Sequence, residues 1–202
     1  VLLVGALQLS RPGYSVDEEF TVFAVRGIQQ HGLPLLPSGL LYDRGIAYSY
    51  AAWLAAAITG SELPAFRAIS LIAAAASVCL TFVLVRRLAN GPAAIAASIF
   101  AALAVPFWAT ATSGRFYAPF LAVYLLTLIC FTHRHWWLLL VAAAMIARLT
   151  HELAFTLAVI PFICCLVDRR DRRRWVYAAL SVVAGLVIGQ AILFALHASV
   201  PS

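Results

Sequence analysis

Three carboxylates stand in a row at Asp17, Glu18 and Glu19, and they are three of the eight acidic residues in the chain. Carboxylates can act as general bases or bind a hard divalent cation such as Mg²⁺ or Mn²⁺. They also suit the first turn of a helix, where the helix dipole favours negative charge. Ser15 and Glu18 have the spacing of a capping box. The run therefore predicts a solvated helix start, or a catalytic or metal-binding carboxylate at Asp17, and a capping role for Glu18 is compatible with either.

A second candidate is Arg115, in the segment Ser113-Gly114-Arg115-Phe116-Tyr117, where a long apolar stretch begins. The guanidinium fork suits phosphate binding, and Gly114 would let a headgroup approach the backbone. The alternative is an arginine that extends its charge to the membrane surface while its stem stays in apolar surroundings.

A third candidate is Arg148-Leu149-Thr150-His151-Glu152, which places three ionisable groups between two apolar stretches. Ionisable residues are costly near hydrocarbon and are functional candidates for that reason. The alternative is a loop whose charges pair with each other. His151 and Glu152 are too few ligands for a zinc site. Arg44 and Arg67 are further cations, and we expect Glu62 to pair with Arg67.

The composition predicts an integral membrane protein. Hydrophobic residues make up 64% of the chain and charged residues only 11%, whereas soluble domains are about half apolar and a quarter charged. All fourteen basic residues are arginines, and they form no stripe interleaved with aromatic residues, so nucleic-acid binding is not expected. The four cysteines lie in apolar segments and their spacing predicts neither a zinc site nor a disulfide framework.

The apolar segments predict an all-α polytopic fold that forms a single transmembrane domain over 1–202, truncated at both ends. Two helices are expected to lie in the membrane interface: 16–31, which is amphipathic, and 46–59, which is short of the roughly 20 residues that a span needs. The expected spans, about seven in number, are 1–9 (partial), 64–87, 92–110, 116–132, 136–148, 151–167 and 175–197.

The arginines predict the orientation of these spans. One set of loops collects eight arginines and two acids: Arg86, Arg87, Arg134, Arg169, Arg170, Arg172, Arg173 and Arg174, with Asp168 and Asp171. The other side has six arginines and six acids: Arg11, Arg26, Arg44, Arg67, Arg115 and Arg148, with Asp17, Glu18, Glu19, Asp43, Glu62 and Glu152. The positive-inside rule makes the first side cytoplasmic, so the acidic run is expected on the outer side.

The order of these features resembles the GT-C glycosyltransferases, in particular the protein-mannosyltransferase-like and aminoarabinose-transferase-like branch. The resemblance rests on an acidic pair after the first apolar segment, the proline-containing stretch 32–39, the stretch 60–70, and Arg115-Phe116-Tyr117-Ala118. It implies a GT-C-like transmembrane bundle with two in-plane helices in the first outer loop. Many members of the branch carry a proline pair where this chain reads Tyr42-Asp43-Arg44-Gly45-Ile46, which leaves the sugar and the acceptor open.

The resemblance implies a membrane-bound, inverting glycosyltransferase that moves a sugar from a polyprenyl-phosphate donor to a hydroxyl or amine of a glycan, lipid or protein acceptor. The active site would lie on the outer face of a bacterial or archaeal cell membrane. Asp17 is expected to be the catalytic base and Glu18 its catalytic neighbour, with a divalent cation (Mg²⁺ or Mn²⁺) on Asp17 as an open alternative. Residues expected to bind the donor phosphate or substrate are Arg44, Arg115, Tyr117, Arg148, His151 and Glu152.

Two alternatives come from other classes. A transporter or flippase of lipid-linked sugars would have a midplane site, broken helices and repeated halves, and we find no internal repeat in the sequence. A non-catalytic polytopic scaffold would leave Asp17, Arg115 and His151 dispersed rather than around one cleft.

Overall fold

The computed structural model describes residues 1–7, 9, 13, 15–133 and 136–200, and of Val4, Val16 and Asp17 only the backbone. Every regular element in this part of the chain is helical, apart from one isolated bridge between Leu35 and Leu41. The elements are α1 (Leu2–Ala6), α2 (Val16–His31), α3 (Ile46–Thr59), α4 (Leu63–Leu88), α5 (Gly91–Leu103), α6 (Val105–Ala111), α7 (Tyr117–Phe131), α8 (Trp137–Thr150), the 3₁₀-helix η1 (Glu152–Phe155), α9 (Thr156–Val167) and α10 (Arg172–Ala198). The all-α prediction is confirmed.

Two helices, α4 and α10, are each long and apolar enough to cross a membrane, and α5 with α6 makes a third if a bent pair counts as one span. Shorter apolar helices run at Ile46–Thr59, Tyr117–Phe131, Trp137–Thr150 and Glu152–Val167. These lengths and compositions are those of an integral membrane protein. The expected ranges coincide with observed helices to within about one turn, except at 92–110.

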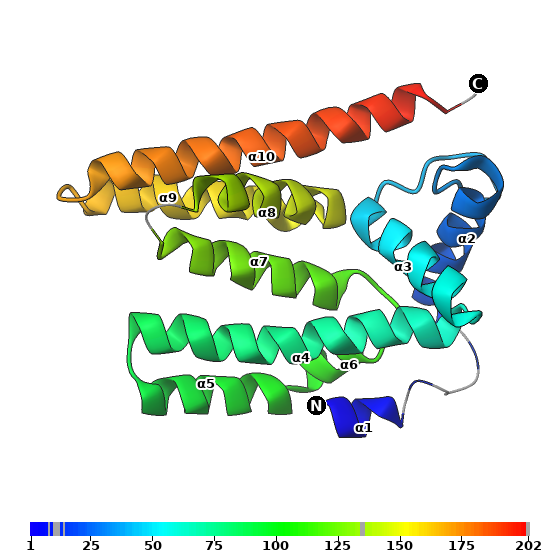
Figure 1. Ribbon diagram of the computed structural model, residues 1–202, viewed down its shortest axis with the longest axis horizontal. Coiled ribbons are helices and arrows are strands. Elements are labelled where there is room, and N and C mark those ends of the chain that lie inside the picture. The colour runs from blue at the N-terminus through cyan, green and yellow to red at the C-terminus, as the bar shows by residue number, and fades with distance from the viewer. Residues whose placement is uncertain (8, 10–12, 14, 134–135, 201–202) are drawn as a thin grey trace.

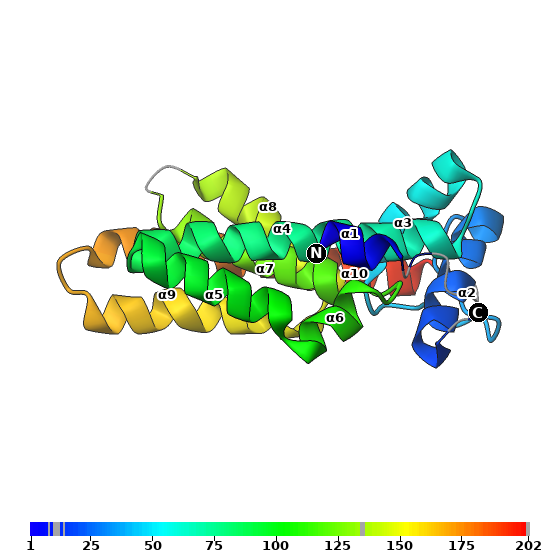
Figure 2. The ribbon, with the colours of Figure 1, turned by 90° about the horizontal axis from the view of Figure 1, so that it is seen from below.

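The helices α4, α5, α7, α8, α9 and α10 lie side by side as an elongated bundle, and α2 and α3 gather at one end of it (Figure 1). Within the bundle α8 packs on α10, and α4 packs on both α7 and α5. The view turned by 90° places α2 and α3 at the same end (Figure 2). We call this the α2/α3 end; it also holds the 112–116 loop and the junction between α8 and η1.

The opposite end holds the end of α7, the start of α8, and the turns that join α4 to α5 and α9 to α10 (Figure 1). We call it the arginine-rich end, after Arg86, Arg87, Arg169, Arg170 and Arg172–Arg174. Arg11 and Arg134 lie outside the described residues. The basic loop expected at 168–174 is shorter than predicted, because α10 already begins at Arg172. The arginine-rich end therefore carries a net positive charge, whereas the arginines of the α2/α3 end are accompanied by acidic residues.

The segment predicted as a span at 92–110 is not one continuous helix, because the chain bends by 65° between α5 and α6. Ala104, between them, has an extended backbone. Pro106 explains the bend, since it has no amide to donate to the Ala102 carbonyl and its ring would crowd that carbonyl in a continuous helix. The Trp108 indole N–H donates to the Ala102 carbonyl instead, over 2.8 Å.

The α2/α3 end is held together by an apolar cluster of Val25, Tyr48, Phe66, Phe116 and their neighbours. Gly45 starts α3 directly against Phe116, with a positive φ of 77°. A Cβ at Gly45 would lie 2.6 Å from the Phe116 ring. Glycine is therefore required at this position for its backbone angle and for its small size.

We expect Gly45→Ala in the full-length protein to lower the thermal unfolding temperature in detergent more than Gly60→Ala. Gly60 ends the same helix with a φ of 70° but has open space where its Cβ would be. Both variants carry the left-handed penalty of roughly 1–2 kcal/mol. Only Gly45→Ala adds the overpacking penalty of about 1–3 kcal/mol. Equal losses would contradict the close contact with Phe116.

Candidate functional site

The acidic run begins α2 at the α2/α3 end, and its second member, Glu18, is almost fully buried. Ser15 and Glu18 form the expected capping box, with the Glu18 carboxylate accepting from the Ser15 backbone N–H over 2.9 Å. Arg67, in the first turns of α4, donates to both carboxylate oxygens over 2.9 and 3.0 Å. The two side chains are 3% and 5% exposed, so this ion pair is shielded from water and depends on its hydrogen bonds to offset desolvation.

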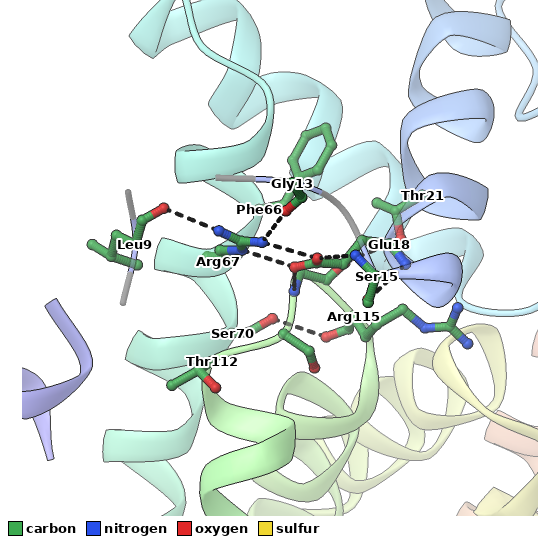
Figure 3. Close-up of polar contacts among 12 residues, drawn as sticks. Leu9, Gly13, Ser15, Glu18, Thr21, Phe66, Arg67, Ser70, Thr112 and Arg115 are labelled. Atoms are coloured by element: carbon green, nitrogen blue, oxygen red, sulfur yellow. Dashed lines mark hydrogen bonds and ion pairs between the residues drawn. The ribbon is translucent and has the colours of Figure 1, made fainter. Parts of the chain in front are cut away.

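The same carboxylate holds the 112–116 loop. The Gly114 N–H donates to Glu18 over 2.8 Å, and the Thr21 hydroxyl donates to the Gly114 carbonyl over 3.1 Å. Ser70, one turn after Arg67, donates to the Arg115 carbonyl over 2.9 Å (Figure 3). The loop is therefore fixed from α2 and from α4. A Cβ at Gly114 would lie 3.0 Å from Phe66 and 3.3 Å from the Glu18 carboxylate, so the close approach needs glycine.

Burial raises the pKa of the Glu18 carboxyl, but the hydrogen bonds from Arg67, Ser15 and Gly114 outweigh it and bring the pKa down to about 2. Glu18 is consequently charged at neutral pH, with each oxygen bound by Arg67 and one backbone amide. These contacts favour a positioning role for Glu18, and the catalytic role stays a prediction.

Two expectations are wrong at this point. Arg67 pairs with Glu18 rather than with Glu62, and Glu62 pairs with Arg26 on the surface over 3.1 Å. The Gly114 backbone is not open to a headgroup, because Glu18 and Thr21 already bind its amide and carbonyl. In both cases the deciding partner lies in α2, which the order of residues along the chain does not indicate.

Arg115 follows Gly114, and its guanidinium extends away from the Glu18–Arg67 pair (Figure 3). The residue is 5% exposed. Its guanidinium carbon lies 5.0 Å from the Phe116 ring centroid and 5.3 Å from the Tyr117 ring centroid, and it donates to the Tyr117 hydroxyl over 3.4 Å. Arg115 is thus a buried cation that lies behind the Phe116 and Tyr117 rings.

Those two rings line a pocket of about 220 Å³ at the α2/α3 end. Five of the six predicted substrate-binding residues share it: Arg44, Tyr117, Arg148, His151 and Glu152. They come from the start of α3, the start of α7 and the α8–η1 junction. Asp43, Phe116, Thr150 and Leu193 complete the lining. The volume is below the roughly 300 Å³ at the lower limit for drug-sized ligands, so the pocket suits a small polar headgroup.

His151 lies at the junction of α8 and η1, where its Nδ1 accepts from the Leu153 backbone N–H over 3.0 Å. Burial lowers the pKa of His151; Glu152 opposes this, and the positive charges of Arg44 and Arg148 add to it. Because Nδ1 is an acceptor, the neutral ring carries its proton on Nε2. His151 therefore offers the pocket a neutral N–H donor, whereas the sequence suggested a cation.

The two arginines of the pocket are held differently. Arg148 donates from Nε to the Gln190 side chain of α10 over 3.0 Å and lies 5.0 Å from the Phe155 ring centroid. Arg44 is exposed and makes no hydrogen bond or ion pair to the residues that the structure describes. Its neighbour Asp43 lies 3.4 Å from His197, near the end of α10. One cation is thus positioned by α10, and the other is available to an anionic ligand.

Asp17 is the predicted catalytic base, and its side chain lies outside the described residues. Its backbone lies between Val16 and Glu18 in the first turn of α2, so it adjoins the carboxylate that binds Gly114. Among the described residues no group of three His, Cys, Asp or Glu side chains could hold a metal ion. The divalent cation on Asp17 stays a prediction.

The site includes residues that sequence reasoning missed. Asp43 adjoins the predicted Arg44, so its position was a usable signal. Gln190 and Leu193 lie near the end of α10 and reach the pocket only through the packing of α10 on α8. Nothing in their local sequence marks them, because a glutamine or leucine in an apolar helix has many ordinary roles.

The bundle and its charged pocket define an all-α integral membrane protein with a candidate binding site for a small anionic group at one end. A family model described as dolichyl-phosphate-mannose-protein mannosyltransferase matches residues 43–197, more than half of the chain. The chain belongs to this family of GT-C-like membrane glycosyltransferases, which confirms the resemblance. The matched range includes every residue that lines the pocket, whereas α2 lies before the matched range. A search of curated proteins and of solved structures finds no significant match.

We expect Glu18→Ala and Arg67→Ala each to destabilise the full-length protein by about 3–5 kcal/mol, because each leaves a buried charge without its partner. The double variant should lose much less than the sum of the two. Chemical unfolding in detergent of the single and double variants measures this coupling.

The matched control is the surface pair, Arg26 and Glu62, whose removal is expected to change stability by less than about 1 kcal/mol. Since the pKa of Glu18 is lowered from 4.5 to about 2, the coupling should be constant above about pH 4.5 and shrink as the pH falls toward 2. Additive losses from Glu18→Ala and Arg67→Ala would rule out the ion pair as the link between α2 and α4.

Proposed function

We propose that the protein transfers a sugar from a polyprenyl-phosphate donor to a hydroxyl or amine acceptor, with inversion, on the outer side of the membrane. The observation that carries this proposal is the pocket itself. It joins two arginines and a neutral imidazole at the end of the bundle opposite the arginine-rich loops. Membership of a mannosyltransferase-like family supports the reaction class.

The donor phosphate would lie between Arg44 and Arg148. The exposed Arg44 can turn toward an anion, and Arg148 is held in place by Gln190. The Nε2–H of His151 would donate to a phosphate oxygen. These donors would stabilise the charge that develops as the glycosidic bond breaks, and the lipid phosphate leaves without needing a proton. Arg115 would add positive charge from behind the aromatic rings.

The lipid tail has a matching path. An apolar groove of about 260 Å³ runs between α9 and α10, lined by Phe155, Ala158, Val183, Leu186, Val187 and Gln190. Two of these residues, Phe155 and Gln190, are also the contacts of Arg148. Arg148 therefore lies between the groove and the charged pocket. A phosphate bound at Arg148 could extend its prenyl chain along the groove.

Asp17 would act as the base. It would accept the proton of the acceptor hydroxyl while that oxygen attacks the anomeric carbon from the face opposite the phosphate. The new glycosidic bond forms as the bond from the anomeric carbon to the phosphate oxygen breaks, which inverts the configuration. Glu18 would contribute by fixing α2 to the 112–116 loop. Glu152 would accept hydrogen bonds from sugar hydroxyls.

The transporter alternative gains little support from the broken helix. The bend at Ala104 follows from Pro106 and from the Trp108 side chain, and neither Pro106 nor Trp108 lines the charged pocket. The scaffold alternative would leave Asp17, Arg115 and His151 dispersed. His151 lies 5.4 Å from Phe116, the neighbour of Arg115 (centroid to centroid), which supports the approach of two of these three residues. An enzyme that acts at one end of the bundle accounts for both findings.

We expect Asp17→Asn in the full-length protein to reduce sugar transfer from a lipid-linked donor in membranes by at least about 100-fold, because general-base catalysis contributes roughly 10²–10⁴-fold. The control is Glu19→Gln, an exposed acid two residues further along the same helix, which should leave transfer nearly unchanged. Wild-type transfer by correctly folded Asp17→Asn would remove Asp17 from the mechanism.

His151→Asn separates the structural and binding roles of the imidazole. The Asn oxygen can accept from the Leu153 N–H as Nδ1 does, since Asn readily forms this local turn, but the Nε2–H donor is lost. We expect a modest drop in the unfolding temperature, because the ring contacts with Phe116 and Phe120 are lost. We also expect a loss of kcat/KM for the lipid donor of roughly 10–100-fold, as for a hydrogen bond to a charged group. Donor kinetics equal to wild type would exclude His151 from the phosphate site.

A further inference from the structure

A second cavity, of about 710 Å³, lies at the arginine-rich end, far along the bundle from the charged pocket. It opens between the last turns of α4 and α7, the α9 helix and the first turn of α10. Its walls are mostly apolar, with Leu84, Leu128 and Ile160 among them, and its polar edge includes Arg87, Arg174 and His133. The proposed sugar transfer uses none of these residues.

Both arginines converge on the end of α7. Arg87 donates to the Thr132 hydroxyl over 2.7 Å and contacts the His133 ring. Arg174 donates to the Phe131 carbonyl and lies 3.8 Å from Asp171. These contacts alone would suit cations that cap a helix C-terminus.

The capping explanation leaves one donor unexplained. The Nε of Arg174 is buried and has no hydrogen-bond partner among the described residues. A buried donor of a charged group without a partner is rare and costly. The arginines Arg86, Arg169, Arg170, Arg172 and Arg173 surround the same end. The cavity therefore combines apolar walls with a positive rim.

We propose that this cavity binds one anionic phospholipid of the membrane leaflet at the arginine-rich end. The phosphate would lie at the guanidinium groups of Arg87 and Arg174, and an acyl chain would fill the apolar part. Basic pockets between membrane helices are known to bind anionic headgroups. The apolar walls favour a lipid over free phosphate, which would leave most of the cavity without a partner.

The test uses the full-length protein in nanodiscs of phosphatidylcholine with about 20% phosphatidylglycerol, which gives the bilayer surface a negative charge. The protein is then released from the nanodiscs, and native mass spectrometry counts the lipids that stay bound to it. We expect selective retention of phosphatidylglycerol, and roughly tenfold weaker retention in the double variant Arg87→Gln and Arg174→Gln. The matched control is Arg169→Gln, an exposed arginine at the same end that does not line the cavity.

A second measurement does not depend on these variants. Trp175 lines the cavity, and its share of the tryptophan fluorescence is the difference between the wild type and Trp175→Phe. Phosphatidylglycerol that carries bromine on its acyl chains should quench this share. The proposal would be overturned by equal retention of both lipids, by equal loss in Arg169→Gln, or by displacement of the lipid with inorganic phosphate alone. Absence of Trp175 quenching would also overturn it, because another part of the protein would then fill the cavity.

Discussion

The ion pair between Glu18 and Arg67 is the interaction on which the α2/α3 end depends. It joins the first turn of α2 to the first turns of α4, and the same carboxylate binds the Gly114 amide. Three segments far apart in the sequence therefore share one buried negative charge. Such a pair contributes little net stability when compared with a well-packed apolar contact, but it is highly demanding in geometry. Its effect here is to fix where Arg115, Phe116 and Tyr117 lie.

From that fixed loop the charged pocket follows. Phe116 is held against Gly45 on one side and against His151 on the other. Arg44 and Arg148 then face the same space from different helices. Arg148 also contacts Gln190, which lines the apolar groove between α9 and α10. A polar headgroup site beside an apolar channel is the arrangement that a substrate with a charged head and a hydrocarbon tail requires.

Much of this architecture was available from the sequence. Helix positions followed from apolar periodicity and from caps such as Ser15, because those signals are local. Five of the pocket residues were found because ionisable side chains are rare and expensive in an apolar chain. Other features depend on tertiary packing. The partner of Arg67 was predicted wrongly, since Glu62 is its neighbour in the sequence and Glu18 comes within reach only through the packing of α2 against α4. The lowered pKa of His151 depends on its burial and on the charges of Arg44 and Arg148, and only its tautomer depends on the Leu153 contact. The bend at Ala104 depends on whether Pro106 begins a new helix or interrupts an old one.

The bond between Glu18 and Gly114 joins residues that are 96 positions apart. A ribosome makes Glu18 first, Arg67 after 49 further residues, and Gly114 last. During synthesis, Arg67 is therefore available to Glu18 before the Gly114 amide is. The charged pocket needs still later segments, because its lining includes His151 at the α8–η1 junction and Leu193 of α10. A nascent chain therefore carries no finished pocket until α10 has been made.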